Sequence, residues 1–255
     1  MKANTPLSLL LSSSFAFGQG GVDQLEDPDK ATWLFGVRVN YRETAYRDIG
    51  PEWGILPYVA YQKGKAHIGF DRITYELATF GNEEAKGSLS AMVRPRTGRP
   101  DPNDDAFFGA DRDFSIDAGL RARIDFPSFY FRSTLLADVT GKYDGFSLAA
   151  RIGKVIPLGE YGSLDLSIGA AYFDENLSEY LFGVSAAQAT PTFGIYDPDA
   201  TWRATVNARF IQPLSQTQFI VLGASLNLLD SGASNSTLLD DDKEFSFFAS
   251  YGWRF

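Results

Sequence analysis

The sequence has 255 residues, which suffices for one all-β barrel domain and is short for two ordinary domains. Aromatic residues make up 15% of the chain, yet the mean hydropathy is only −0.15. That combination is too polar for a bundle of membrane helices and unusually aromatic for a soluble protein. The formal net charge of −9 argues against nucleic acid as a partner, because phosphate binding needs clustered Lys and Arg.

The N-terminus has the features of a secretory signal. Lys2 supplies a positive start, residues 7–17 are modestly apolar, and small residues at Ala16 and Gly18 occupy the positions that a signal peptidase reads. We therefore predict a signal peptide over 1–18 and a periplasmic N-terminal segment over 19–31, the alternative being a disordered start. The chain has no cysteine, which suits an exported protein without disulfides. The rest of the sequence contains no run of about 18 apolar residues, so we predict no membrane-spanning helix.

From residue 32 onward the dominant hydrophobic period is two. Between 114 and 125 the even-numbered positions are apolar, from Phe114 to Ile124, while the odd-numbered ones are polar or small, from Ser115 to Asp125. Successive side chains of a strand point to opposite faces, so this pattern predicts a strand with one apolar and one polar face. The same alternation recurs at 33–41, 164–172, 202–210 and 220–228.

Strand length separates a membrane barrel from the soluble alternatives, a β-sandwich or a lipocalin-like barrel. The alternating segments run for about ten residues or more, which a tilted strand needs to cross a bilayer. The polar face also carries charged side chains at mid-strand, which suits an aqueous or hydrogen-bonded lumen. We predict a transmembrane antiparallel up-and-down β-barrel over 32–255 in the cell outer membrane, surrounded by lipid and lipopolysaccharide. The predicted lumen-facing charges are Arg121, Arg123, Arg132, Arg151, Arg209, Asp117, Asp138 and Asp165.

The strand count from the alternation is eleven, whereas single-chain bacterial barrels have an even number. The predicted segments are 32–43, 52–62, 65–77, 87–97, 113–125, 127–139, 145–157, 160–172, 200–213, 216–229 and 243–255. A short strand over 180–187 would make twelve, and one spurious N-terminal segment would leave ten; we favour twelve. In bacterial barrels the short turns face the periplasm and the long loops, here 97–112, 174–200 and 230–244, lie outside. Because successive strands cross the membrane in opposite directions, the predicted strands cannot satisfy this arrangement between Lys65 and Arg112; we call this the parity conflict.

The last segment alternates up to the final residue. The residues from Phe245 to Phe255 at odd-numbered positions are aromatic or small and apolar, and the chain stops on Phe255. An aromatic end on an alternating strand is similar to the assembly signal of outer-membrane proteins. We therefore expect Tyr251, Trp253 and Phe255 to be read by the outer-membrane assembly machinery.

Two segments in the second half carry a family resemblance. Residues 181–189 resemble the Y-F-G-V-x-x-x-Q-A loop of the MipA/OmpV family, the MltA-interacting outer-membrane proteins, and residues 194–198 resemble the Gly, Tyr and Pro that follow it. Leu181 departs from the family's Tyr, and the family's Ser-Pro segment is not evident at 231–237. The matching residues are Phe182, Gly183, Val184, Ser185, Gln188, Ala189, Gly194, Tyr196 and Pro198.

The resemblance implies a structural scaffold that recruits peptidoglycan-remodelling enzymes, namely a murein lytic transglycosylase and a peptidoglycan synthase. The alternative is a porin-like channel for small solutes. The lumen arginines could form a selectivity surface for such a channel, or they could pair with aspartates and plug the lumen. A barrel of about 12 strands lies between the filled 8-strand and the open 16-strand cases, so both remain open.

Catalytic and metal-binding patterns are weak in this sequence. Some outer-membrane barrels cleave lipids with a Ser–His pair, but the one histidine, His67, follows a short turn and is better explained as a rim residue. The acidic stretches around 101–113 and 240–242 do not have the spacing of a calcium loop. We predict no enzymatic activity, no cofactor and no metal.

Overall fold

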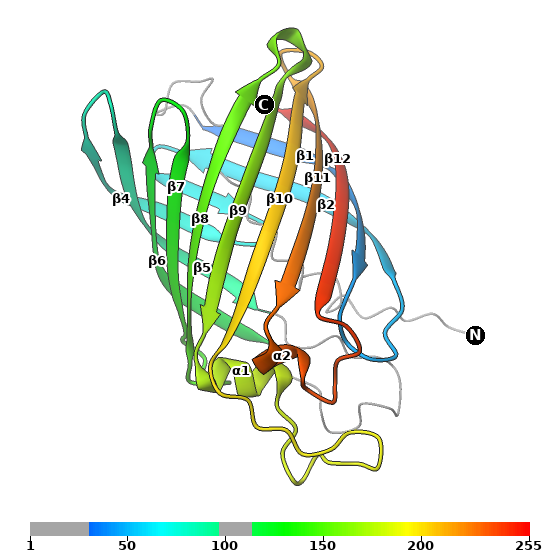
Figure 1. Cartoon of the computed structure of the whole chain (residues 1–255). Coiled ribbons are helices and arrows are strands. Elements are labelled where there is room, and N and C mark those ends of the chain that lie inside the picture. Colours follow the sequence, from blue (N-terminus) through cyan, green and yellow to red (C-terminus); the bar gives the residue numbers. More distant parts are fainter. Residues whose placement is uncertain (1–30, 97–113) are drawn as a thin grey trace.

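The computed structural model describes residues 31–96 and 114–255, and the predicted signal peptide lies outside the described residues. The predicted segment 19–31 is described only at residue 31. The chain forms a closed antiparallel barrel in which each strand pairs with its neighbours in sequence and β12 pairs with β1 (Figure 1). The strands are β1 (Thr32–Glu43), β2 (Glu52–Lys63), β3 (Ala66–Gly69), β4 (Ile73–Gly81), β5 (Lys86–Arg96), β6 (Ser115–Asp125), β7 (Tyr130–Asp138), β8 (Phe146–Pro157), β9 (Ser163–Phe173), β10 (Thr201–Pro213), β11 (Gln218–Leu229) and β12 (Lys243–Arg254).

The predicted count of twelve strands is confirmed, but the twelfth strand has a different origin. The segment predicted as one strand over 65–77 is two, β3 and β4, joined by a tight turn in which the Gly69 N–H donates to the Arg72 carbonyl at 2.8 Å. This extra reversal removes the parity conflict. The short connections β2–β3, β4–β5, β6–β7, β8–β9 and β10–β11 now lie at one end of the barrel, the short-turn end (Figure 1). The β1–β2, β7–β8, β9–β10 and β11–β12 connections lie at the other, the loop end, and the tight β3–β4 turn is the one short connection directed toward that side among the described residues.

The prediction of a short strand over 180–187 is wrong. Residues Glu175–Phe182 form a helix, α1, and only Val184 makes an isolated bridge, with Tyr196. The Asp174 carboxylate accepts the Leu177 N–H at 3.0 Å and so caps the helix N-terminus. Leu177 and Tyr180 are buried one turn apart, which is the spacing of a helix face and not of a strand.

The cap at Asp174 gives a first testable prediction. Asp174→Ala removes the acceptor for a helix N–H and is expected to lower the free energy of unfolding by about 1 kcal/mol. Asp174→Asn keeps an acceptor of nearly equal quality and is the matched control. Urea unfolding followed by tryptophan fluorescence measures both, and an equal loss in the two variants would contradict the capping role.

The alternating pattern sorts side chains onto the two faces of the wall as predicted. On β1, Trp33, Phe35 and Val37 are exposed on the outside, whereas Leu34, Arg38 and Asn40 are buried inside. Aromatic pairs lie on the outer surface near both ends of the barrel, as expected for the two membrane interfaces. They are Trp33–Tyr61 and Tyr251–Trp253 near the short-turn end, and Tyr41–Trp53 and Tyr172–Trp202 near the loop end.

Short turns of bacterial barrels face the periplasm, so we assign the short-turn end to that side. The described part of the chain contains no helix long and apolar enough to span a bilayer.

Candidate functional site

The loop end is covered by an apolar cluster, which we call the cap. It is built from α1, the short helix α2 (Ser231–Ser234) and the β1–β2, β7–β8, β9–β10 and β11–β12 connections (Figure 1). The buried members of the cap are Ala45, Tyr46, Tyr143, Ala171, Phe173, Leu177, Tyr180, Phe182, Val184, Phe193, Leu229, Ala233, Leu238 and Leu239. Segments far apart in sequence meet there, so the cap fastens several loops across one end of the lumen.

The apolar residues of the family motif lie in the cap. Phe182 and Val184 are buried members of it, and Ala189 and Tyr196 pack against it. The Tyr196 hydroxyl also donates to the Gly232 carbonyl at 2.8 Å, which ties the motif loop to α2. Pro198 is buried as well.

The remaining motif residues shape the loop itself. Gly183 ends α1, and a Cβ there would lie 2.6 Å from the Glu179 carbonyl oxygen, so no larger residue fits without a shift. The Gln188 side-chain oxygen accepts hydrogen bonds from the backbone N–H and the hydroxyl of Ser185. The Gly194 carbonyl accepts the Thr237 hydroxyl at 3.0 Å. The motif therefore builds a folded cover at the loop end and does not lie at the short-turn end.

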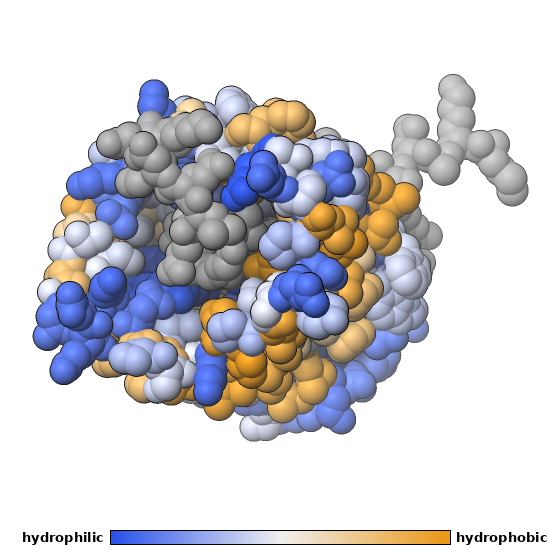
Figure 2. All heavy atoms as spheres, turned by 90° about the horizontal axis from the view of Figure 1, so that it is seen from above, coloured by the Kyte–Doolittle hydropathy of each residue, from blue (hydrophilic) through white to orange (hydrophobic). Residues whose placement is uncertain are grey.

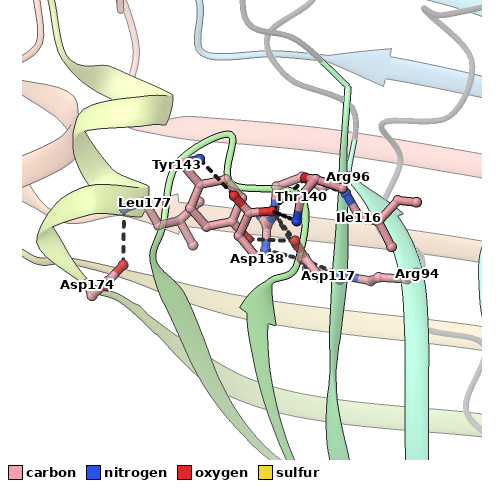
Figure 3. Close-up of polar contacts among 9 residues, drawn as sticks. All are labelled: Arg94, Arg96, Ile116, Asp117, Asp138, Thr140, Tyr143, Asp174 and Leu177. Carbon is pink, nitrogen blue, oxygen red and sulfur yellow. Dashed lines mark hydrogen bonds and ion pairs between the residues drawn. The ribbon is translucent and has the colours of Figure 1, made fainter.

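Beneath the cap, a buried carboxylate collects two arginines and a tyrosine (Figure 3). Asp117 of β6 is 0% exposed, and the Arg94 and Arg96 guanidinium groups of β5 lie 3.3 Å and 2.7 Å from its carboxylate. The Tyr143 hydroxyl donates to the same carboxylate at 2.5 Å. Charge-assisted hydrogen bonds of this kind are stronger than neutral ones, and here they join β5, β6 and the β7–β8 loop inside the lumen below the cap.

Tyr143 connects the ion pairs to the cap. It comes from the β7–β8 loop, and its ring lies 5.1 Å from that of Tyr180 in α1. Burial raises the pKa of Tyr143 above the usual phenol value, and the hydrogen bond to Asp117 adds to the rise despite the nearby Arg96. The phenol therefore keeps its proton and remains a donor to the carboxylate.

Asp138, one of the predicted lumen charges, binds backbone N–H groups of a loop, unlike Asp117, which binds arginine side chains. It ends β7 at the rim, where its carboxylate accepts the backbone N–H groups of Thr140, Lys142, Tyr143 and Asp144. Figure 3 shows Asp138 with two of these partners, Thr140 and Tyr143. It therefore holds the β7–β8 loop that delivers Tyr143, whereas the lumen arginines of the described chain form their ion pairs with other carboxylates, such as Asp117 and Asp165.

A second buried pair lies deeper in the lumen. Arg209 of β10 donates to Asp165 of β9 at 3.0 Å, and the Tyr130 hydroxyl donates to the other oxygen of the same carboxylate at 2.9 Å. Arg123 pairs with Asp125 near the short-turn end. Beside them Arg38 stacks on Phe248 at 4.2 Å and on Phe70 at 5.2 Å, so aromatic rings also occupy the lumen.

The described residues leave spaces between these groups. A cavity of about 110 Å³ lies inside the barrel and is lined by Arg121, Arg132 and Arg151, among others. A wider space of about 430 Å³ opens at the short-turn end among the β6–β7 turn, β8, β9 and β10. Figure 2, which looks onto that end, shows hydrophilic residues along one side of the rim and hydrophobic residues along the other.

Several lumen residues escaped the sequence prediction. Arg38, Arg72, Arg94, Arg96 and Arg203 all contribute to the interior described above or to the lining of the inner cavity. Four of them stand on the polar positions of alternating segments, which is the signal that would have included them. Arg72 belongs to the β3–β4 turn, which the alternation did not reveal.

The predicted assembly signal lies on the outer face of β12. Tyr251 and Phe255 are exposed, and the Phe255 backbone exchanges hydrogen bonds of 2.9 and 3.0 Å with Trp33 of β1. The end of β12 therefore takes part in closing the barrel wall.

His67 lies on β3 opposite Gln62 and Thr74, near the short-turn end. Within residues 31–96 and 114–255, no three His, Cys, Asp or Glu side chains come together as metal ligands would. The acidic stretch 101–113 lies outside the described residues.

Comparison with solved structures gives outer-membrane barrels of very low sequence identity. An outer membrane channel from Pseudomonas putida F1 aligns with 93% of this chain and 100% of its own, at 12% identity and a TM-score of 0.45. A loop L8 deletion mutant of OmpT, an outer membrane protein of Vibrio cholerae, aligns with 90% of this chain and 100% of its own, at 5% identity and a TM-score of 0.44.

Sequence comparison is more specific. YiaT of Escherichia coli (strain K12), which is named as an outer membrane protein, is 23% identical over 223 residues, covering 86% of this chain and 89% of YiaT. The model of the family described as "MltA-interacting protein MipA" matches residues 11–255. With its closed barrel and its motif residues in the cap, this outer-membrane chain belongs to the family of the MltA-interacting protein MipA.

Proposed function

We propose that this protein is a non-enzymatic scaffold of the outer membrane that holds a periplasmic peptidoglycan-remodelling enzyme of the murein lytic transglycosylase class. A murein synthase would join through the same complex. One observation carries the proposal: the interior is occupied by the Asp117 and Asp165 ion pairs, with the cap over the loop end. A barrel filled in this way serves as a rigid anchor better than as a passage. Family membership supports the choice of partner class.

The short-turn end is where such a partner would dock, because it faces the periplasm. Tyr161 in the β8–β9 turn is 64% exposed and Leu214 in the β10–β11 turn is 46% exposed. The two turns are neighbours, since a Cβ at Gly162 would lie 2.0 Å from the Ile211 carbonyl oxygen of β10. They thus offer an apolar contact beyond the strand ends, of the kind that anchors protein interfaces.

A capture experiment tests the proposal. The full-length barrel in detergent is immobilised and offered a purified MltA-type lytic transglycosylase. We expect capture by the wild type and at least a tenfold loss with Tyr161→Ser combined with Leu214→Ser. Ile195→Ser, an equally exposed apolar site at the loop end, is the matched control and should capture normally. Absence of capture by the folded wild type would remove the scaffold function.

A porin-like channel is the second candidate, and the 430 Å³ space at the short-turn end together with the arginine-lined cavity favours it. Planar-bilayer recording separates the two functions. The scaffold predicts no steady current through the wild type. A steady anion-selective current would instead establish the channel.

A further inference from the structure

The inner cavity has an unbalanced positive lining. Six of its lining residues are arginines and none is an Asp or Glu. The arginines are Arg72, Arg94, Arg121, Arg132, Arg151 and Arg203. The carboxylates nearby are already engaged, Asp117 by Arg94, Arg96 and Tyr143, Asp165 by Arg209 and Tyr130, and Asp71 by Arg72.

Arg132 is the clearest case of a cation without a counter-charge. Its side chain is 4% exposed, and none of its three guanidinium nitrogens has a hydrogen-bond partner within the described part of the chain. Its guanidinium lies 5.4 Å from the centre of the Tyr130 ring, a contact that leaves the N–H donors unused. Arginine does not lose its proton in proteins, so this burial cost cannot be relieved by deprotonation.

The strand register adds to the excess of positive charge, because it places arginines side by side on neighbouring strands. Arg123, Arg132 and Arg151 stand directly opposite one another on β6, β7 and β8. Like charges opposite each other on neighbouring strands are destabilising. Arg123 is balanced by Asp125, whereas no carboxylate of the described residues lies within ion-pair distance of Arg132 or Arg151.

The neighbouring row explains why there is a space at all. Arg121 of β6 and Arg203 of β10 belong to the same cross-strand row, separated by Thr134, Ala149 and Ala171. Small side chains between two long cations leave an opening, and Gly169 beside Arg151 enlarges it. A buried water needs about 10–15 Å³ of such space, so a cavity of about 110 Å³ accommodates a tetrahedral oxyanion with some water.

We propose that this cavity binds a small free oxyanion, of the phosphate, sulfate or carboxylate type, held by the guanidinium groups of Arg132, Arg151 and Arg121. The planar N–H fork of arginine matches such groups in pairs of hydrogen bonds. The anion would supply the missing counter-charge. The wider space at the short-turn end contains Tyr130 and Arg123 in its lining, so it adjoins Arg132 and offers an entrance from the periplasm.

The test uses the full-length protein in detergent free of lipopolysaccharide. Sodium phosphate, sulfate and succinate are compared with sodium chloride at equal ionic strength, using urea unfolding and, for phosphate, calorimetric titration. We expect at least one of the three oxyanions to raise the unfolding midpoint of the wild type, because a ligand that binds only the native state stabilises it. Arg132→Met should weaken that binding at least tenfold and, in chloride alone, should be no less stable than the wild type.

Arg47→Met is the matched control, because Arg47 pairs with Asp240 in the loop region away from the cavity, and it should bind as the wild type does. Arg151→Lys keeps the charge but loses the planar fork, so weakened binding in this variant serves as the readout if Arg132→Met does not fold. Phosphatidic acid in the micelles should not replace free phosphate, because the cavity lies inside the wall. A wild type that responds to no oxyanion, a response to the lipid alone, or unchanged binding in both cavity variants would overturn the proposal.

Discussion

Asp117→Ala is expected to lower the free energy of unfolding by about 3–5 kcal/mol, because it leaves buried arginine charge without its partner. Arg96 and Arg94 both contact this carboxylate, and Asp117 has no exposed surface that would let water replace it. The variant also deprives the Tyr143 hydroxyl of its acceptor and so weakens the link to the cap. Urea unfolding of the refolded barrel, followed by tryptophan fluorescence, measures the loss.

Asp240→Ala is the control for this prediction, because Asp240 also pairs with an arginine but near the surface. The Arg47 and Asp240 side chains are 35% and 55% exposed, so the loss should stay below about 1 kcal/mol. Similar losses from the two variants would mean that the Asp117 cluster is not the buried, tightly paired centre described here.

The barrel could be predicted from the sequence because apolar and polar residues alternate with a period of two along each long strand of its wall. Strands such as β1 (Thr32–Glu43) begin and end where the alternation does, since lipid on one side and lumen on the other act on every residue. The polar face of these segments contains Arg121, Arg132 and Asp165, which are buried in the structure. Which carboxylate meets which arginine depends on register between strands distant in sequence. The pairs Arg94–Asp117 and Arg209–Asp165 were therefore not predictable from spacing.

Two local errors have a common physical cause, which is that short apolar runs do not distinguish strand from helix or turn. Residues 180–187 contain Leu181, Phe182 and Val184 in a strand-like run, but the Asp174 cap and the burial of Leu177 favour α1. The split between β3 and β4 depends on Gly69 and Asp71, two turn-forming residues inside a segment that otherwise alternates. In both places tertiary contacts, with the cap or with the lumen, decide the structure.

The cap gives the second large prediction. Leu177→Ala removes a fully buried side chain from the cap and is expected to lower its stability by about 2–5 kcal/mol, the range for Leu→Ala changes that leave a cavity. The backbone N–H of residue 177 can still bond to Asp174, so the effect isolates packing from helix capping. Leu214→Ala, at an exposed short turn, is the matched control and should change little.

The cap and the apolar cluster between β1, β2, β10, β11 and β12 are separate. Loss of packing in the cap should therefore open the loop end while the strands stay paired, since proteins unfold locally where buried contacts are lost. Limited proteolysis of Leu177→Ala is expected to cut the 183–200 loop much faster than in the wild type. The heat-modifiable migration of the folded barrel on gels should persist under the same conditions. If loop cleavage and loss of the barrel band occurred together, the cap and the wall would form one cooperative unit, and the Asp117 and Tyr143 cluster that joins them would be the physical reason.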